Sequence, residues 1–294
     1  MVLGEVLTAI VTPFDASGEV DYDRFRALAS HLVDNGSDGL VVAGTTGESP
    51  TLSDDERLDL ISAALDAVGD RATVVASTGT YSTAHSVHLT EQAHERGAHA
   101  FLVITPYYNK PPPRGIVEHF KAIAAVSDRP IVVYNIPARV VLNLETETIA
   151  ELGEIPTVRA VKQANADVDQ ARRIVELGLD LYAGDDNLVM PFLEVGGLGG
   201  VCVHTHVVGP QVKEQVTRFR EGDADGARRI DEEITPALDI LQVQTNPIAI
   251  KAALNLLGHE VGGLRLPLVE ANDEEIAAVR DCLERLKLLE PSRV

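Results

Sequence analysis

Lys162 is the residue whose type and position most directly suggest chemistry. It ends the β-rich run VRAVK, and polar residues follow it together with Asp167 and Asp169, which are typical of a helix start. This pattern predicts a buried parallel strand with Lys162 at its C-terminal end. A partly desolvated amine there has a nucleophilic neutral fraction, as Schiff-base chemistry on a ketone requires. The structural alternative is a lysine that ends a strand and extends into solvent.

Tyrosines mark the ends of two other predicted strands. Tyr108 lies in the motif PYYNKP and Tyr134 in YNIPAR, and these two motifs hold three of the six tyrosines in the chain. A tyrosine can shuttle a proton if a neighbour passes that proton onward, and Thr45 is a candidate relay. Tyr134 and Lys162 are one strand–helix repeat apart, so we expect them at equivalent heights on adjacent strands. The alternative for each tyrosine is core or interface packing.

Two further motifs could bind a small carboxylate. The glycines of GTTGES (44–49) allow tight turns, and its hydroxyls and loop amides could hold a carboxylate, although the motif could also be a simple turn. It is not a phosphate-binding P-loop, because no Gly-Lys-Ser/Thr follows. Arg139 could clamp a carboxylate with two hydrogen bonds, or it could form a surface ion pair.

The histidines give no metal-binding pattern. His85 and His88 lie three apart on a predicted helix, and His204 and His206 share one side of an extended run, yet no third ligand of suitable spacing accompanies either pair. We therefore expect no metal site. The sequence Gly184-Asp185-Asp186 is interpreted as a loop that braces the floor of a pocket.

Composition favours a soluble, cytoplasmic protein. The 294 residues are 45% hydrophobic and carry a formal charge of -20, which argues against nucleic acid or an anionic membrane as a partner. No run approaches membrane-spanning length, and the beginning of the chain lacks the basic region of a signal peptide. The only cysteines, Cys202 and Cys282, suggest no disulfide framework.

Eight strand–helix units repeat along the chain and predict a single parallel (β/α)8 TIM barrel. The competing open doubly wound sheet is disfavoured because no glycine-rich dinucleotide motif follows the first strand. We expect the barrel and its active site in residues 1–223, and a helical region used in assembly in residues 224–294. The expected strands are 5–14, 38–44, 72–78, 98–106, 130–137, 158–162, 180–184 and 199–203, and the expected helices include 20–36, 54–67, 83–96, 115–126, 145–153, 187–194, one from about 209, 246–258 and 273–289.

The motifs GTTGES, TPYYNKP, YNIPAR, the strand-borne Lys162 and GDD occur in this order, and together they resemble the dihydrodipicolinate synthase family. That family belongs to the pyruvate-dependent class I aldolase and lyase superfamily, which includes N-acetylneuraminate lyase. The resemblance spans nearly the whole chain, including the C-terminal motifs NPI and LRLPL. It implies condensation of pyruvate with L-aspartate 4-semialdehyde in diaminopimelate and lysine biosynthesis, with no metal and no redox cofactor.

The resemblance also assigns catalytic roles. Lys162 would form the Schiff base with pyruvate, and Tyr134 would be the proton donor and acceptor. Thr45 and Tyr108 would complete its relay, with Tyr108 lent by a neighbouring subunit. A dimer would then be the minimal active unit, and two dimers would form a homotetramer.

Four residues would bind the substrates. Thr46 would hold the pyruvate carboxylate, Gly184 and Val201 would line the pyruvate pocket, and Arg139 would receive the carboxylate of aspartate semialdehyde. Sialic acid lyases and sugar-acid aldolases of the superfamily tend to lack this arginine, and a reaction of their type is the alternative function. A non-catalytic pyruvate or amino-acid binding protein is the alternative from another class.

Some positions depart from the family pattern. Gln163 stands where an acid is common, and the eighth strand reads VCVHTH in place of small residues and an asparagine. At the lysine feedback site the usual two histidines are replaced by Asp54 and Arg57, and an asparagine and a glutamate by Tyr81 and His85. The resemblance therefore implies weak or absent inhibition by lysine.

Overall fold

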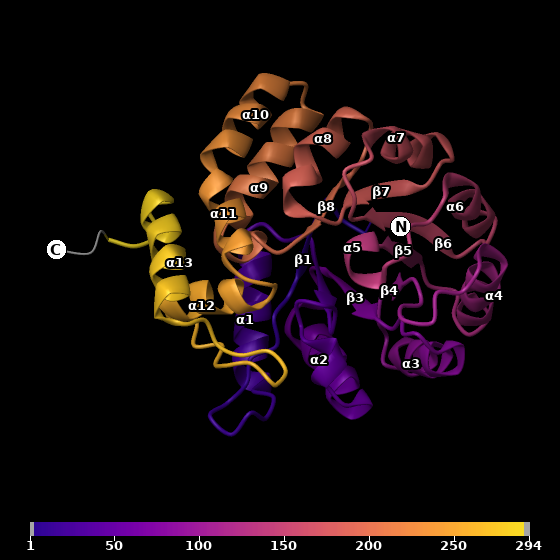
Figure 1. Ribbon diagram of the computed structural model, residues 1–294, viewed down its shortest axis with the longest axis horizontal. Helices are drawn as coiled ribbons and strands as arrows, with labels where there is room; N and C mark the ends of the chain where they lie inside the picture. Colours follow the sequence, from indigo (N-terminus) through magenta and orange to yellow (C-terminus); the bar gives the residue numbers. More distant parts are fainter. Residues whose placement is uncertain (1–2, 291–294) are drawn as a thin grey trace.

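Eight parallel strands close into a barrel in the computed structural model, which describes residues 3–290 (Figure 1). The first strand pairs with both the second and the eighth, so the sheet has no free edge. The predicted TIM barrel is therefore confirmed. The strands are β1 (Val6–Ala9), β2 (Gly39–Val42), β3 (Thr73–Ser77), β4 (Ala100–Ile104), β5 (Ile131–Asn135), β6 (Val158–Gln163), β7 (Asp180–Ala183) and β8 (Gly199–Cys202).

Helices surround the barrel and connect its strands. Several begin at a side-chain cap, as at Ser53, which forms a capping box with Glu56, and at Asp167, whose carboxylate accepts from the Gln170 amide. The predicted helix start after Lys162 is thereby confirmed. The helices are α1 (Tyr22–Asp34), α2 (Asp54–Val68), α3 (Thr83–Glu95), α4 (Pro113–Ala124), the short α5 (Pro137–Val140), α6 (Thr146–Gly153), α7 (Val168–Glu176), α8 (Val189–Glu194) and α9 (Thr205–Arg220).

Two apolar cores follow from the alternation of side chains along each strand. One set points into the barrel, where Leu7, Val41, Val132 and Tyr182 form a packed interior. The other set points outward and packs against the ring of helices. Because the interior is filled with side chains, a cavity can form only at an end of the barrel.

Within the described residues, four helices follow the barrel and lie on the side of α9, to the left in Figure 1. They are α10 (Ala224–Glu233), α11 (Thr235–Val243), α12 (Ile248–Leu256) and α13 (Asp273–Arg285). α10 packs on α9, and α13 packs on both α11 and α12. Residues 1–2 and 291–294, the two ends of the predicted regions, lie outside the described residues.

Most predicted boundaries lie within about two residues of the observed ones, and three differ by more. β1 ends at Ala9 rather than at residue 14, because the chain then turns away from the barrel and forms a single antiparallel bridge from Phe14 to Val20. α9 starts at Thr205, before the expected residue 209, and has a kink at Val208, two residues ahead of Pro210. The last helix ends at Arg285 rather than at residue 289.

Two expectations from composition can be compared with the structure. Cys202 and Cys282 are both buried and both free, so they form no disulfide with each other. Within residues 3–290, none of the helices combines the length and the apolar character needed to cross a membrane.

Acid should destabilise the fold through two buried histidines. Burial lowers the pKa of His119 and of His206 to about 4 in each case. In the unfolded chain the pKa values of these histidines are higher. Between about pH 6.5 and pH 4 the unfolded chain therefore binds more protons than the folded chain, and stability falls as the pH falls. Each histidine contributes a slope of up to about 1.4 kcal/mol per pH unit. Urea denaturation at pH 7, 6 and 5 measures this slope of the free energy of unfolding against pH.

His119→Phe provides the matched variant for this prediction. The Nδ1 of His119 contacts the Thr83 hydroxyl at 2.9 Å, whereas its Nε2 has no hydrogen-bond partner among the described residues. An apolar ring should therefore fit and remove one of the two contributions to the slope. An unchanged slope in this variant would show that His119 is not the group responsible.

Candidate active site

A cavity of 370 Å³ opens at the C-terminal ends of the barrel strands. This is the end at which the βα loops of such barrels converge. Its wall contains six of the eight residues that the sequence singled out, namely Thr45, Thr46, Tyr134, Arg139, Lys162 and Gly184. The predicted residues thus come together in one site, apart from Tyr108 and Val201.

Lys162 and Tyr134 lie side by side in the cavity. They are register partners on β6 and β5, as the repeat spacing predicted. The Lys162 Nζ lies 4.2 Å from the centroid of the Tyr134 ring, and both residues are only 5% exposed. Ala160 belongs to the barrel interior, and Lys162, two residues on, faces the same side. A buried amine therefore lies against a phenol, and this phenol can exchange a proton with a molecule bound to the amine.

The loop after β2 brings two hydroxyls to the cavity. Thr46 is 2% exposed, and its Oγ1 accepts a hydrogen bond of 2.9 Å from the Asn246 side-chain amide. With that bond accepted, the Thr46 hydroxyl can donate its own proton to a bound oxygen. Thr45 precedes it in the same wall. The loop is therefore suited to hold an anionic oxygen close to the Lys162 amine.

Charge of both signs lines the cavity. Arg139 stands on α5, directly after β5, and Asp185 follows β7. Desolvation and the negative charge of Asp186 raise the pKa of Asp185, while the positive charges of Lys162 and Arg139 oppose the rise. In a chain with a net charge of -20, these two cations give the cavity local positive charge that can attract a carboxylate.

Gly184 and Val201 occupy different levels of the barrel. A Cβ on Gly184 would come within 2.8 Å of the Ala164 Cβ, so the close approach of the loops after β6 and β7 requires glycine here. Val201 lies in the packed interior and is not part of the cavity wall. Val203, just past the end of β8, lines the cavity instead.

Tyr108 points away from the cavity of its own chain. It lies in the loop after β4 and is 94% exposed, with a positive φ of 71°. The preceding Tyr107 turns the other way and packs edge-on against Tyr81, at 5.4 Å between ring centroids. A phenol so exposed contributes nothing to the site of this chain.

Of the departures from the family pattern, Gln163 and His204 lie outside the cavity, whereas Val203 lines it. Gln163 follows Lys162 and therefore faces the opposite side of β6, where its amide bonds Asn135 and Gln170. His204 pairs with Asp186 and is not among the lining residues. Gln163 and His204 therefore leave the cavity wall unchanged, and Val203 is the one residue of VCVHTH that a substrate could touch.

Asp186 lines the cavity and braces the loop after β8. Its Oδ1 accepts from the amides of Val203 at 2.7 Å and His204 at 2.6 Å, and it lies 2.5 Å from the His204 Nδ1. Burial by itself would raise the pKa of Asp186, but His204 and these hydrogen bonds outweigh it and hold the pKa below its usual range.

Sequence spacing did not predict the grouping around His204. The ligand atoms of Asp186, Cys202 and His204 all lie within 4.8 Å of one another. Because the Asp186 oxygen is already bonded to two amides, we interpret the group as a structural brace. The expectation that His204 and His206 share one side of an extended run is wrong, because the helix α9 begins at Thr205. His206 lies in α9, where its Nδ1 contacts the Val203 carbonyl oxygen.

Sequence reasoning missed the contribution of the C-terminal region to the cavity. Part of the wall comes from Leu238, Leu241, Gln242 and Thr245, at or just after α11, and from Asn246. The spacing of the first four residues is that of one face of a helix, and this spacing is the only sequence signal that they could act together. Nothing local in the sequence indicates that this face covers the barrel.

The arrangement supports imine chemistry on a small keto acid. The buried amine could attack the carbonyl carbon, and the adjacent phenol could transfer protons as water leaves. The threonine hydroxyls could hold the carboxylate of the same molecule, and Arg139 could hold a second carboxylate farther out.

Known proteins are similar to this chain in sequence and in fold. The model of the dihydrodipicolinate synthetase family matches residues 2–286. The chain is 48% identical over 287 residues to 4-hydroxy-tetrahydrodipicolinate synthase of Heliobacterium modesticaldum, covering 97% of this chain and 96% of that relative. The crystal structure of dihydrodipicolinate synthase from Cyanidioschyzon merolae with lysine bound superposes with a TM-score of 0.95 at 40% identity, covering 98% of this chain and 99% of the other. The chain belongs to the dihydrodipicolinate synthetase family.

Proposed function

We propose that this protein condenses pyruvate with L-aspartate 4-semialdehyde through a Schiff base on Lys162. The observation that carries the proposal is the buried Lys162 amine 4.2 Å from the Tyr134 ring, in a cavity that also contains two threonines and an arginine. Near-full-length similarity to relatives named 4-hydroxy-tetrahydrodipicolinate synthase supports it. The reaction belongs to diaminopimelate and lysine biosynthesis, and we propose that it takes place in the cytoplasm.

In the proposed mechanism, the Lys162 amine attacks the keto carbon of pyruvate and water leaves, which gives an imine. Thr46 holds the pyruvate carboxylate next to Gly184. Loss of a methyl proton gives an enamine, whose carbon attacks the aldehyde of the second substrate while Arg139 binds its carboxylate. The amino group of that substrate then attacks the imine carbon, closes the ring and releases Lys162. Tyr134 donates and accepts the protons of these steps, with Thr45 as its relay.

We also propose that two subunits complete each active site. Tyr108 is 94% exposed on a loop with positive φ, a geometry suited to insertion into a neighbouring subunit. A dimer would be the smallest active unit and a tetramer of two dimers the complete assembly. Helices of region 224–294 would contribute to assembly as well as to the cavity wall.

Turnover by the purified protein tests the proposal. Pyruvate-dependent consumption of aspartate semialdehyde, followed through a coupled reductase, is the expected result. If borohydride traps pyruvate on the protein but no semialdehyde is consumed, the barrel chemistry is right and the acceptor is wrong. Sugar acids and N-acetylmannosamine would then be the substrates to test.

Arg139→Ala should weaken binding of the second substrate selectively. Loss of a paired, charge-assisted hydrogen bond should raise the KM for aspartate semialdehyde by roughly 10- to 100-fold. Trapping of pyruvate on Lys162 should be unaffected. Steady-state kinetics with each substrate varied in turn measures the difference. An Arg139→Ala variant with an unchanged KM for the semialdehyde would favour a different aldolase or lyase reaction.

Free lysine should inhibit this protein weakly or not at all. The Asp54 carboxylate lies 2.9 Å from the His85 Nε2, so the acid at this position already has a hydrogen-bond partner. An incoming ammonium group would find no free carboxylate there. Calorimetry and rate measurements can use the Cyanidioschyzon merolae protein, whose structure has lysine bound, as a positive control. Near-full inhibition at low millimolar lysine would contradict the prediction.

A further inference from the structure

Lys251 and Glu48 form an ion pair that is almost completely shielded from water. The Lys251 Nζ lies 3.0 Å from the Glu48 Oε1, and the two side chains are 1% and 0% exposed. The same Nζ donates to the Thr12 carbonyl oxygen at 2.9 Å and lies 4.4 Å from the centre of the Phe14 ring. Burial lowers the pKa of Lys251, and Glu48 opposes that shift. The mechanism described above uses neither residue.

The pair acts directly on the turn that carries Thr45 and Thr46. Glu48 has a left-handed backbone, with φ 57°, and its amide donates to the Thr45 carbonyl oxygen at 3.1 Å. A non-glycine residue in this conformation needs surrounding contacts to hold it. Next to it, the Gly47 carbonyl oxygen accepts from the Thr12 hydroxyl at 2.7 Å. The Glu48 side chain therefore anchors a strained turn that ends beside the cavity.

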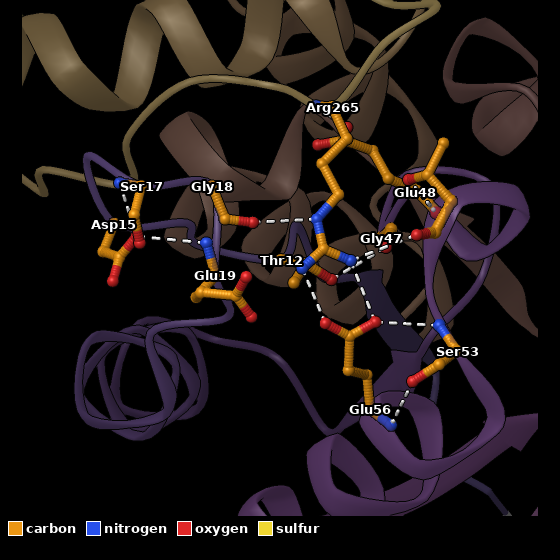
Figure 2. A network of polar contacts seen from close by, with 11 residues as sticks. Thr12, Asp15, Ser17, Gly18, Glu19, Gly47, Glu48, Ser53, Glu56 and Arg265 are labelled. Carbon is orange, nitrogen blue, oxygen red and sulfur yellow. Dashed lines mark hydrogen bonds and ion pairs between the residues drawn. The ribbon is translucent and has the colours of Figure 1, made fainter.

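Three other partners of this turn come from one C-terminal segment, residues 246–265. Asn246 donates to the Thr46 hydroxyl, Lys251 binds Glu48, and the Arg265 amide donates to the Glu48 Oε2 at 3.1 Å. Figure 2 shows the Arg265 side chain between Gly18 and Glu56, with Glu48 beside it. The guanidinium bonds both Glu56 oxygens, at 2.9 and 2.6 Å, which fixes this segment against the start of α2.

We propose that Lys251 and Glu48 are positioning residues that set the affinity for pyruvate. They hold the turn so that the Thr46 hydroxyl faces the position of the substrate carboxylate. Neither residue touches the substrate. The inference rests on the proposed function, because it assumes that pyruvate forms an imine on Lys162 with its carboxylate at Thr46.

The test must separate positioning from simple stability. Removing one partner leaves a buried charge unpaired and is strongly destabilising, whereas replacing both charges with side chains of similar volume is often tolerated. The informative variant is therefore the double substitution Glu48→Gln with Lys251→Met. The glutamine can still accept from the Arg265 amide, and the methionine replaces much of the lysine stem.

Affinity for pyruvate is measured from the fraction of protein trapped by borohydride as pyruvate is varied. We expect the folded double variant to bind pyruvate about tenfold or more weakly, as when a hydrogen bond to a charged group is weakened. Its kcat at saturating pyruvate should change far less. A purely structural pair would lower Tm without this separation of KM from kcat.

Two further variants complete the experiment. Thr12→Val removes only the hydroxyl bonded to Gly47, and it should also weaken pyruvate binding, so the proposal can be tested even if the double variant does not fold. Arg285→Ala breaks the exposed Arg285–Asp239 pair of the same C-terminal region and should change nothing.

If the double variant folds and binds pyruvate with unchanged affinity, the inference is wrong while the proposed function stands. If the double variant does not fold, unchanged affinity in Thr12→Val has the same meaning. Failure of the unmodified protein to trap pyruvate would overturn the proposed function together with the inference.

Discussion

Lys162→Ala should reduce turnover on the order of 10⁶-fold, the scale seen when the nucleophile of a covalent enzyme is removed. The proposed reaction passes through a bond from the Lys162 nitrogen to the keto carbon of pyruvate, and no other group can replace that bond. The cavity and its carboxylate-binding turn remain in the variant, so pyruvate should still bind non-covalently. Mass spectrometry after borohydride treatment should find the adduct on Lys162 in the unmodified protein and none in the variant.

Lys213→Ala is a matched control for this experiment. Lys213 lies near the opposite end of the barrel, where its Nζ bonds Asp38 at 2.9 Å and Glu5 at 3.2 Å. Its replacement should leave both trapping and turnover intact. An adduct that persists in Lys162→Ala would show that another amine forms the imine.

Tyr134→Phe should lower kcat by roughly 10²- to 10⁴-fold, the usual contribution of a positioned acid–base group. Phenylalanine keeps the ring that lies 4.2 Å from the Lys162 Nζ, so the packing of the amine should be preserved. Only the phenolic hydroxyl is lost. Pyruvate should still be trapped on Lys162 after long incubation, and stopped-flow measurement should locate the slowed step in imine formation or in later proton transfer.

Tyr182→Phe controls for the loss of a buried phenol as such. The Tyr182 hydroxyl donates to the Gly4 carbonyl oxygen at 2.8 Å, at the end of the barrel away from the cavity. This variant should lose some stability but keep its turnover rate. Equal losses of rate in the two tyrosine variants would remove the evidence for a specific role of Tyr134.

The site could be predicted from sequence wherever it depends on short-range patterns. Parallel strands repeat at regular intervals, so residues at corresponding strand ends meet at one end of the barrel. This is why Tyr134 and Lys162 could be paired before the structure was known, and the register of β5 and β6 confirms the pairing. Side-chain alternation also explains why Lys162 faces the cavity while Gln163 faces the helices.

The tertiary structure was needed for contacts between distant parts of the chain. Residue spacing did not reveal that Asp186 pairs with His204, that Val203 rather than Val201 lines the cavity, or that α11 covers it. Each of these contacts depends on the path that a loop takes after its strand ends. Loop paths follow from packing and hydrogen bonding with partners elsewhere, and not from local periodicity.

By itself, the sequence determined the barrel, the strand that carries Lys162, and the tyrosine beside it, because alternation along strands and the caps of helices are encoded within a few residues. Only the tertiary structure decided that the C-terminal region takes part in the site. Lys251 and Glu48 are 203 positions apart, and Asn246 and Thr46 are 200 apart. No local pattern encodes such pairs, because they form only when the closed barrel brings α12 and the segments flanking it against the turn after β2.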